Sequence, residues 1–358
     1  MVTRNLILKK IKMSAPKIII KILDYCNRGC LHCCIDAKPK GKTMSEDDFF
    51  YVLETLEHSP KLPQGRIIGL TGGDVLQHPD LGHVLDLFLQ RSLRVNLGTR
   101  GFTSHERRID ALPYRNFRAL IDRMNQRYPQ LKNPLDVSLS FDVYGFKGNK
   151  EKSLDALTSA LPELLEYSLS SISIIMTSSP ERKDETTEFF IEALRRRGSI
   201  GGTFTEYYWR QKWAELNDIV FNSTVENTIG VFPIKKKGGG GVDIRLGKLD
   251  FGGRADRLSE THGRKTRCNV LHGREYAFVD INLDVRLCCG AQSDQLALPY
   301  SNLRDNPLAI YPREPDRDYL KYVEALRVME KKFHSKRHLE SICSYCAKTM
   351  PGLLGIKA

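Results

Sequence analysis

Short apolar runs rich in β-branched residues alternate with helical patterns along the first two thirds of the chain. The run KIIIKIL at residues 17–23 is almost continuously apolar, which is typical of a strand buried on both faces of a parallel sheet. Such alternation predicts parallel βα units and an α/β fold, with the chemistry on loops at the carboxyl ends of the strands. The predicted strands are residues 17–23, 66–74, 93–102, 135–142 and 170–178, with a weaker sixth at 201–209; the predicted helices are 43–58, 79–92, 153–168 and 184–198.

The loop after the first predicted strand, DYCNRGCLHCC at residues 24–34, holds four of the nine cysteines, and the other five lie between residues 268 and 346. Two clusters and an odd total argue against a disulfide framework and indicate metal ligation. A closed structural zinc site needs four ligands, whereas three close thiolates suit an iron–sulfur cubane with one iron left open. We expect Cys26, Cys30 and Cys33 to be the ligands. Cys34 is the alternative ligand, or a small buried hydrophobic residue.

Composition narrows the class of protein. The chain is 41% hydrophobic and 27% charged, as in ordinary soluble domains. It has no apolar run of about 18 residues, so we expect no transmembrane helix, and the basic leader at residues 1–16 lacks a signal-peptide pattern. We therefore expect a cytoplasmic protein. The formal net charge of +12 fits an acidic redox partner, an acidic peptide, nucleic acid or simply a solvated basic surface.

Two segments depart from the βα pattern. Residues 113–134 are a basic insertion with aromatic residues, and residues 234–265 are rich in glycine and lysine, which is typical of linker and loop.

The sequence CNRGCLHC resembles the cluster motif of the radical S-adenosylmethionine (radical SAM) enzymes, with His32 in the position before the third cysteine. LTGGDVLQHP resembles the Gly-Gly-Glu motif of that family, in which the acidic residue and the backbone hold the methionine amino group; here Asp74 replaces glutamate. LGTRGF stands where the family has Thr-Asn-Gly, and VSLSFDVYG resembles its Ser-x-Asp-Gly. The cofactor-binding residues that the resemblance implies are His32, Gly72, Gly73, Asp74, Thr99, Ser140 and Asp142. For the arginine that meets the SAM carboxylate the sequence offers only Lys147, Lys150 and Lys152.

The C-terminal cysteines resemble a SPASM/twitch-type auxiliary cluster domain. The segment LDVRLC at residues 283–288 matches its Gly-x-Val-x2-Cys hairpin with leucine in place of glycine, and CSYC closes the pattern at residues 343–346. The implied ligands of one auxiliary 4Fe–4S cluster are Cys268, Cys288, Cys343 and Cys346. Cys289 is the alternative to Cys288, and a structural zinc on the same residues is the alternative to the cluster.

The resemblance implies a partial (β/α)6 TIM-type barrel at residues 17–210, a linker at 211–252 and a twitch/SPASM-like cluster-binding subdomain at 253–358. It implies an enzyme that cleaves SAM reductively to a 5′-deoxyadenosyl radical, which abstracts a substrate hydrogen. We expect a peptide or protein substrate and a low-potential reductant, a flavodoxin or ferredoxin. Small-molecule dehydrogenation or epimerisation, RNA modification and a non-catalytic iron–sulfur or zinc protein are the alternatives. The sequence leaves open whether SAM is consumed or regenerated, and the oligomeric state.

Overall fold

A computed structural model describes most of the chain after the predicted leader, which lies outside the described residues. The described residues are 17–27, 29–33, 37–58, 67–99, 117–131, 133–155, 157–158, 171–197, 206–221, 229–235, 241–248, 268, 270–271, 276–287, 301–310, 317–335 and 342–356. The strands are β1 (Lys17–Lys21), β2 (Ile67–Thr71), β3 (Arg94–Thr99), β4 (Leu135–Ser140), β5 (Ser171–Ser178), β6 (Ile229–Lys235), β7 (Gly241–Lys248), β8 (Tyr276–Val279), β9 (Asp284–Arg286) and β10 (Ser301–Asn302). The helices are α1 (Glu46–Glu57), α2 (Leu81–Leu89), α4 (Phe117–Arg127), α5 (Gly145–Gly148), α7 (Lys183–Arg197), α8 (Glu206–Phe221), α9 (Arg317–Ser335) and α10 (Ile342–Leu354), with 3₁₀ turns η1 (Val75–Gln77), η3 (Pro129–Leu131), η4 (Pro180–Arg182) and η8 (Pro307–Ile310).

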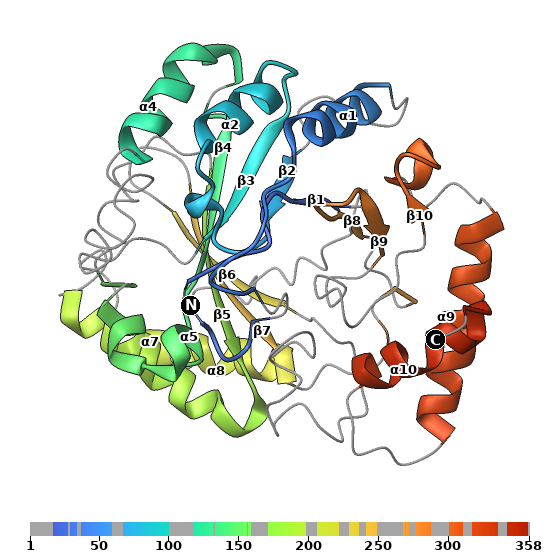
Figure 1. The fold of residues 1–358 in the computed structure, drawn as a ribbon. Helices are drawn as coiled ribbons and strands as arrows, with labels where there is room; N and C mark the ends of the chain where they lie inside the picture. Colours follow the sequence, from blue (N-terminus) through green and yellow to red (C-terminus); the bar gives the residue numbers. More distant parts are fainter. Residues whose placement is uncertain are drawn as a thin grey trace, which may run out of the picture.

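The strands form one mixed sheet in the order β10-β9-β8-β1-β2-β3-β4-β5-β7-β6. Strands β8, β1, β2, β3, β4, β5 and β7 run parallel to one another, and β9, β10 and β6 are added antiparallel at the two ends. In Figure 1, α1, α2 and α4 lie along one side of the parallel strands, and α7 and α8 lie along another. The last two helices of the chain, α9 and α10, lie at the right of the view, beyond β8 and β9. The structure therefore confirms an α/β fold with a parallel sheet.

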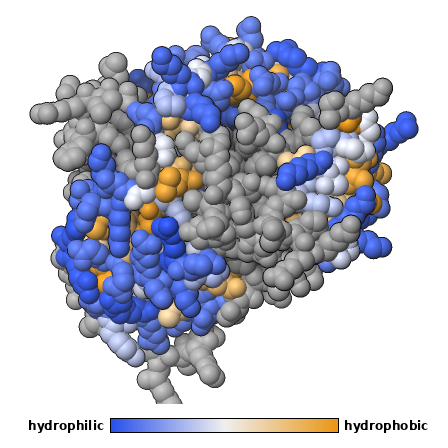
Figure 2. Space-filling view, turned by 60° about the horizontal axis from the view of Figure 1, so that its bottom comes forward, coloured by the Kyte–Doolittle hydropathy of each residue, from blue (hydrophilic) through white to orange (hydrophobic). Residues whose placement is uncertain are grey.

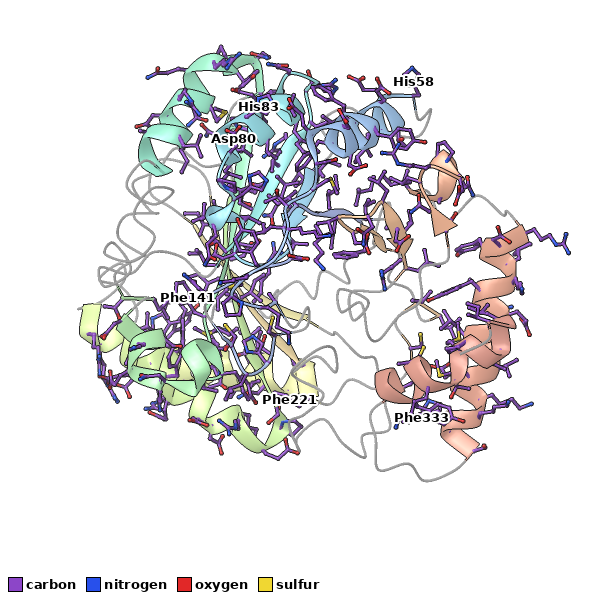
Figure 3. The ribbon with its side chains drawn as sticks, in the orientation of Figure 1. His58, Asp80, His83, Phe141, Phe221 and Phe333 are labelled. Atoms are coloured by element: carbon purple, nitrogen blue, oxygen red, sulfur yellow. The ribbon has the colours of Figure 1, made fainter. Side chains whose placement is uncertain are left out.

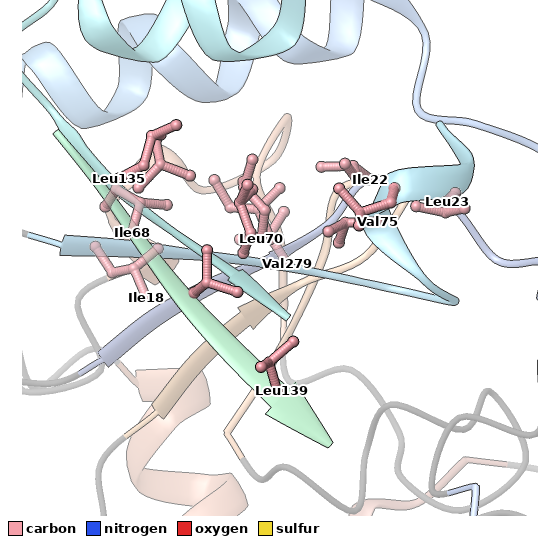
Figure 4. Close-up of a cluster of buried hydrophobic side chains, with 14 of the residues drawn as sticks. Ile18, Ile22, Leu23, Ile68, Leu70, Val75, Leu135, Leu139 and Val279 are labelled. Carbon is pink, nitrogen blue, oxygen red and sulfur yellow. The ribbon is translucent and has the colours of Figure 1, made fainter. Parts of the chain in front are cut away.

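The hydrophobic core lies between the strands and the helices that follow them. Ile18, Ile68, Leu70 and Leu135 are buried on the helix-facing side of β1, β2 and β4, and Figure 4 shows them gathered with their neighbours beneath two helices. Helix α1 begins where the sequence predicts, because the Ser45 hydroxyl accepts a hydrogen bond from the Asp48 backbone N–H and acidic residues fill the first turn. All five strongly predicted strands are confirmed as β1–β5.

The predicted sixth strand at residues 201–209 is wrong over its described part. Residues 206–209 begin helix α8, and residues 201–205 lie outside the described residues. Trp209, Trp213, Leu216 and Val220 are all buried, and their helical spacing continues well past residue 209. The aromatic run that resembles a strand therefore begins a helix, with Trp209 on its buried face and Tyr207 exposed.

Strand β7 takes the place of the sixth strand, beside β5. Both β6 and β7 fall within residues 211–252, the segment predicted as linker and loop. Val242, Ile244 and Leu246 alternate with polar residues and glycine, which is a strand pattern that the neighbouring glycine tract obscures. The boundaries of the predicted domains stay predictions.

The basic insertion at residues 113–134 supplies helix α4. Its buried residues Ile121 and Met124 enter the core, the Tyr128 hydroxyl donates to Asp86 Oδ1 at 2.9 Å, and Arg127 forms an ion pair with Asp86 at 2.8 Å. These contacts join the insertion to α2, so its described aromatic side chain, Tyr128, serves packing.

The surface view in Figure 2 is mostly hydrophilic over the described residues, with hydrophobic residues in small separate groups. In the part of the chain that the structure describes, none of the helices has the length and apolar character needed to cross a bilayer.

Candidate functional site

The predicted site residues follow neighbouring parallel strands. Cys26 comes after β1, Gly72 after β2, Thr99 ends β3, and Asp142 follows β4. Because these strands are parallel and hydrogen-bonded side by side, their carboxyl ends share one edge of the sheet. The structure therefore brings these sequence-predicted residues to one place.

The cysteine loop is an ordered turn in its described residues. Cys26 and Cys30 are each 9% exposed, Cys33 is partly exposed, and none of the three forms a disulfide. Gly29 has φ 64°, a left-handed conformation that glycine adopts without strain, and the Cys33 N–H donates to the Cys30 carbonyl at 3.4 Å. Cys34, the alternative fourth ligand, lies outside the described residues.

A strap at residues 37–43 holds the first half of this loop. The Cys26 N–H donates to the Lys38 carbonyl at 2.6 Å, and the Asp24 N–H donates to the Lys42 carbonyl at 3.0 Å. The Lys42 N–H in turn donates to Asp24 Oδ1 at 2.6 Å. The strap presents Lys38, Lys40 and Lys42 to solvent beside the loop.

Gly72 and Gly73 lie directly against the backbone that leads into the cysteines. A Cβ added to Gly72 would lie 1.9 Å from the Leu23 carbonyl oxygen, and Gly72 also has φ 136°. A Cβ added to Gly73 would lie 1.6 Å from the Tyr25 carbonyl oxygen and 2.9 Å from the Cys26 Cβ. The glycine pair therefore forms a cradle for the cysteine loop that any side chain would fill.

Asp74 and Thr99, both predicted to bind the cofactor, contact each other. The buried Asp74 carboxylate caps η1 by accepting the Leu76 N–H at 3.2 Å, and it accepts the Thr99 hydroxyl at 2.6 Å. Both hydrogen bonds fall on Oδ1. They fix the orientation of the carboxylate relative to β3.

Gln77 ties the turn after Asp74 to the cysteine loop. Its side-chain Nε2 donates to Asn27 Oδ1 at 2.6 Å, the Asn27 N–H donates to Gln77 Oε1 at 3.4 Å, and the Tyr25 hydroxyl donates to the Gln77 carbonyl at 3.0 Å. His78 follows; burial lowers the pKa of its imidazole to about 4, and its Nδ1 accepts the Asp80 N–H at 3.2 Å.

The segment after β4 contacts the second half of the loop. His32 Nε2 lies 3.2 Å from Asp142 Oδ2, with the two side chains 13% and 0% exposed. Asp142 Oδ1 also accepts the Tyr144 N–H at 3.0 Å, and the Leu31 N–H donates to the Tyr144 carbonyl at 3.0 Å. The His32 and Tyr144 rings lie 5.4 Å apart. Phe141, labelled in Figure 3, is buried at the start of this segment.

Ser140 ends β4 on the polar face of the sheet, the face away from the core. The same face carries Asp136 and Ser138, whose side chains accept from Ser171 at 2.7 Å and donate to Asn96 at 3.0 Å. This face of β4 therefore carries hydrogen-bonding groups, whereas ordinary parallel strands are apolar on both faces.

Sequence reasoning missed Arg182. It ends the turn after β5, and its guanidinium carbon lies 5.1 Å from the centre of the Tyr144 ring. Of the lysines considered in its place, Lys150 and Lys152 are exposed, and the Lys147 side chain is outside the described part of the chain. The sequence feature that could have drawn attention to Arg182 is the segment Ser-Ser-Pro-Glu-Arg, which is typical of a turn and comes at the end of a predicted strand.

The C-terminal cysteine set is only partly described. The Cys268 N–H donates to Glu330 Oε1 at 2.6 Å, and burial raises the pKa of the Cys268 thiol to about 11. Cys346 lies partly buried on α10, which packs on α9 through the Phe333 and Tyr345 rings, 5.5 Å apart (Figure 3). Cys288, Cys289 and the Cys343 side chain lie outside the described residues.

The predicted hairpin is present as β8 and β9, and Leu283 in its turn has φ 65°. This is the position where the SPASM/twitch pattern has glycine. The next turn docks on the N-terminal region: the Tyr51 hydroxyl of α1 donates to the Leu303 carbonyl at 3.0 Å, and Arg304 forms an ion pair with Asp48 at 2.7 Å.

The donor set at the N-terminal loop fits a cluster on three thiolates. Among the described residues no three His, Cys, Asp or Glu side chains converge on a point that would suit a single metal ion. The fit therefore rests on the donor chemistry: one loop supplies three thiols, which is the ligand set of a cubane with one iron left without a protein ligand. The glycine pair packs against the backbone that leads into Cys26, and it thereby supports the loop that carries the thiols.

Comparison with known proteins finds a family model that matches the part of the chain holding this edge of the sheet. Residues 20–125 match the model of the Radical SAM superfamily, which supports a radical SAM domain over the cysteine loop, the glycine pair and Thr99. The match covers less than a third of the chain. No curated protein matches the chain in sequence.

Several solved structures resemble the chain at low identity. Native anSMEcpe with bound AdoMet is 13% identical, with 96% of this chain and 99% of that chain covered and a TM-score of 0.49. SuiB of Streptococcus suis bound to S-adenosylmethionine is 12% identical, with 92% and 77% covered and a TM-score of 0.49. BtrN in complex with AdoMet and 2-DOIA is 12% identical, with 92% of each chain covered and a TM-score of 0.40. Similarities at this level carry no conclusion about substrate or mechanism.

Proposed function

We propose that this protein is a radical SAM enzyme, built on a partial (β/α)6 barrel with a twitch/SPASM-like C-terminal subdomain. One observation carries the proposal. The Cys26–Cys30–Cys33 loop rests on the Gly72–Gly73 pair at the carboxyl edge of the parallel strands, inside the segment that matches the superfamily.

In this proposal Cys26, Cys30 and Cys33 hold a 4Fe–4S cluster. Such a cluster with bound SAM supplies reductive cleavage of the sulfonium, in which one electron yields methionine and a 5′-deoxyadenosyl radical that takes a substrate hydrogen. The chain supplies the rest. It would offer three thiolates to the cluster, and it keeps the Cys26 and Cys30 thiols largely shielded from water.

The Gly72–Gly73–Asp74 turn is proposed to bind the methionine amino group. The Asp74 carboxylate accepts the Thr99 hydroxyl at 2.6 Å and is buried, so its direction is set before any ligand arrives. Aspartate is one methylene shorter than the glutamate of the family motif, and Thr99 anchors it from the next strand.

The segment after β4 and the turn after β5 are proposed to hold the rest of SAM. Ser140 offers a hydroxyl to the ribose or carboxylate, and His32 presents its ring beside the Tyr144 ring. Arg182 is the cation that we assign to the SAM carboxylate, because the guanidinium lies over Tyr144 at the same sheet edge.

A second 4Fe–4S cluster on Cys268, Cys288, Cys343 and Cys346 is part of the proposal. The position of Cys268, whose N–H donates to Glu330 of α9 next to the helix that carries Cys346, and the predicted β8–β9 hairpin support it. The substrate we propose is a peptide or protein, on the resemblance of this C-terminal segment to SPASM/twitch domains. The reductant we propose is a flavodoxin or ferredoxin, and the exposed lysines of the strap beside the cysteine loop suit an acidic donor.

The test is anaerobic formation of 5′-deoxyadenosine from SAM with dithionite. The wild-type protein should form it, and Cys26→Ala, Cys30→Ala and Cys33→Ala should each abolish it because each removes a ligand. Cys34→Ala is the matched control and should keep at least partial turnover. An inactive Cys34→Ala variant would overturn the three-ligand assignment. An iron-loaded wild type that forms no 5′-deoxyadenosine would overturn the proposed activity and show a non-catalytic iron–sulfur protein.

A further inference from the structure

The cysteine loop is held from two sides by side chains that are not cluster ligands. On the β2 side, the Gln77 amide exchanges two hydrogen bonds with Asn27, at 2.6 Å and 3.4 Å. On the β4 side, Asp142 lies 3.2 Å from His32. The first contact holds the residue after Cys26, and the second holds the residue before Cys33. Cys30 lies between the two, next to the left-handed Gly29.

Each contact is anchored in turn. Gln77 belongs to η1, whose N-terminus is capped by the Asp74 side chain, and the Tyr25 hydroxyl donates to the Gln77 carbonyl at 3.0 Å. Asp142 is fully buried and accepts the Tyr144 N–H at 3.0 Å, so its carboxylate cannot swing away from His32 without leaving that donor unsatisfied.

We propose that Gln77 and Asp142 are positioning residues that clamp the cysteine loop in its cluster-binding shape. A loop ordered beforehand loses less conformational entropy when it takes up a ligand, and a ligand held by it escapes more slowly. The consequence for the cluster rests on the proposed function. The clamp itself is a property of the chain and is measurable without any cluster.

The expected size follows from the hydrogen bonds. Together, two amide hydrogen bonds are enough to change the equilibrium constant for opening of the loop about tenfold, because about 1.4 kcal/mol corresponds to a factor of ten. Gln77→Leu removes both bonds to Asn27 and leaves the main-chain contact with Tyr25. Asp142→Leu removes the contact with His32, whereas Asp142→Asn keeps an oxygen for the Tyr144 N–H and should restore most of the effect. Gln126→Leu is the control, because Gln126 is an exposed amide on α4.

The first measurement is the alkylation rate of Cys30 by iodoacetamide in the full-length protein without cluster, followed by peptide mass spectrometry. Cys30 is 9% exposed, so a clamped loop should react slowly. We expect labelling about tenfold faster in Gln77→Leu and Asp142→Leu, and a wild-type rate in Gln126→Leu. Far-UV circular dichroism checks that each variant folds; if Asp142→Leu does not, Gln77→Leu decides.

The second measurement uses the reconstituted protein. Iron release to a ferrous chelator should be about tenfold faster in Gln77→Leu than in the wild type, and the electron paramagnetic resonance spectrum of the reduced protein should broaden. Wild-type labelling and wild-type iron release in Gln77→Leu would overturn the clamp. Faster labelling in a protein whose wild type holds no iron would support the clamp and overturn the proposed function.

Discussion

Replacing Gly73 with alanine tests how the cysteine loop is supported. The added Cβ would lie 1.6 Å from the Tyr25 carbonyl oxygen and 2.9 Å from the Cys26 Cβ, and real Cβ atoms essentially never approach within 3.0 Å. The loop backbone must therefore retreat by at least about 1.4 Å. The obstacle is main chain, which cannot rotate away as the end of a flexible side chain could.

Adding this one methyl group should lower both the stability of the protein and its activity. Overpacking of this kind lowers the free energy of unfolding by about 1–3 kcal/mol. A displacement of about 1 Å at a reacting centre reduces rate by about a hundredfold, and Cys26 is a proposed ligand on the displaced segment. We expect Gly73→Ala to bind less iron per chain and to form 5′-deoxyadenosine at least about a hundredfold more slowly.

Gly69→Ala is the matched control, four residues earlier in the same strand and turn. Its Cβ would lie 3.5 Å from the nearest atom, an ordinary contact, so we expect wild-type iron content and unchanged or slightly higher stability. The assay is iron and sulfide content after anaerobic reconstitution, followed by 5′-deoxyadenosine formation. A Gly73→Ala protein with wild-type iron and turnover would refute the idea that the glycine pair carries the cluster loop.

Three further predictions concern the rest of the chain. Reconstituted wild type should hold about eight irons, and the triple variant Cys26→Ala/Cys30→Ala/Cys33→Ala about four; one zinc and no iron in that variant would make the C-terminal site structural zinc. Glycine variants are usually less stable than alanine variants, but we expect Leu283→Gly to be at least as stable as Leu283→Ala in denaturant unfolding. Alanine keeps the cost of the left-handed backbone at this position, about 1 kcal/mol, and glycine does not. A clearly less stable glycine variant would contradict this. Burial lowers the folded-state pKa of His78 to about 4, below its unfolded value of 6.5. The contribution of the neutral imidazole to the free energy of unfolding is therefore full above pH 6.5 and is lost as the pH falls toward 4. Unfolding free energy should therefore drop by about 2 kcal/mol more between pH 7 and pH 5 in the wild type than in His78→Asn, and equal slopes would show that this histidine is not buried neutral.

Local patterns were enough to predict the first five strands and the cysteine loop. Each strand is a short apolar run, and the spacing of Cys26, Cys30 and Cys33 lies within one loop. The same kind of signal misled at residues 206–209, because aromatic residues favour strands as well as buried helix faces. Trp209, Trp213 and Leu216 are all buried, four and then three residues apart, which is the spacing of one helix face and not of a strand.

Contacts between distant residues left no local signal. Asn27 and Gln77 are separated by 50 positions; one lies in the cysteine loop and the other in the short turn η1, and a single sequence gives no reason to pair them. Arg182 likewise reaches Tyr144 only because β4 and β5 are neighbours in the sheet. The glycine pair was predicted for a different reason, cofactor binding, and the structure adds its close contact with the Tyr25 backbone.

The most direct test of the central claim is whether SAM binds to iron held by the three-cysteine loop. Electron–nuclear double resonance of the reduced, reconstituted protein should be recorded with SAM carrying ¹⁵N in the methionine amino group. We predict a ¹⁵N coupling in the wild type and in Cys34→Ala, and none in Cys30→Ala. An iron-loaded, reduced wild type without that coupling at saturating SAM would contradict the account.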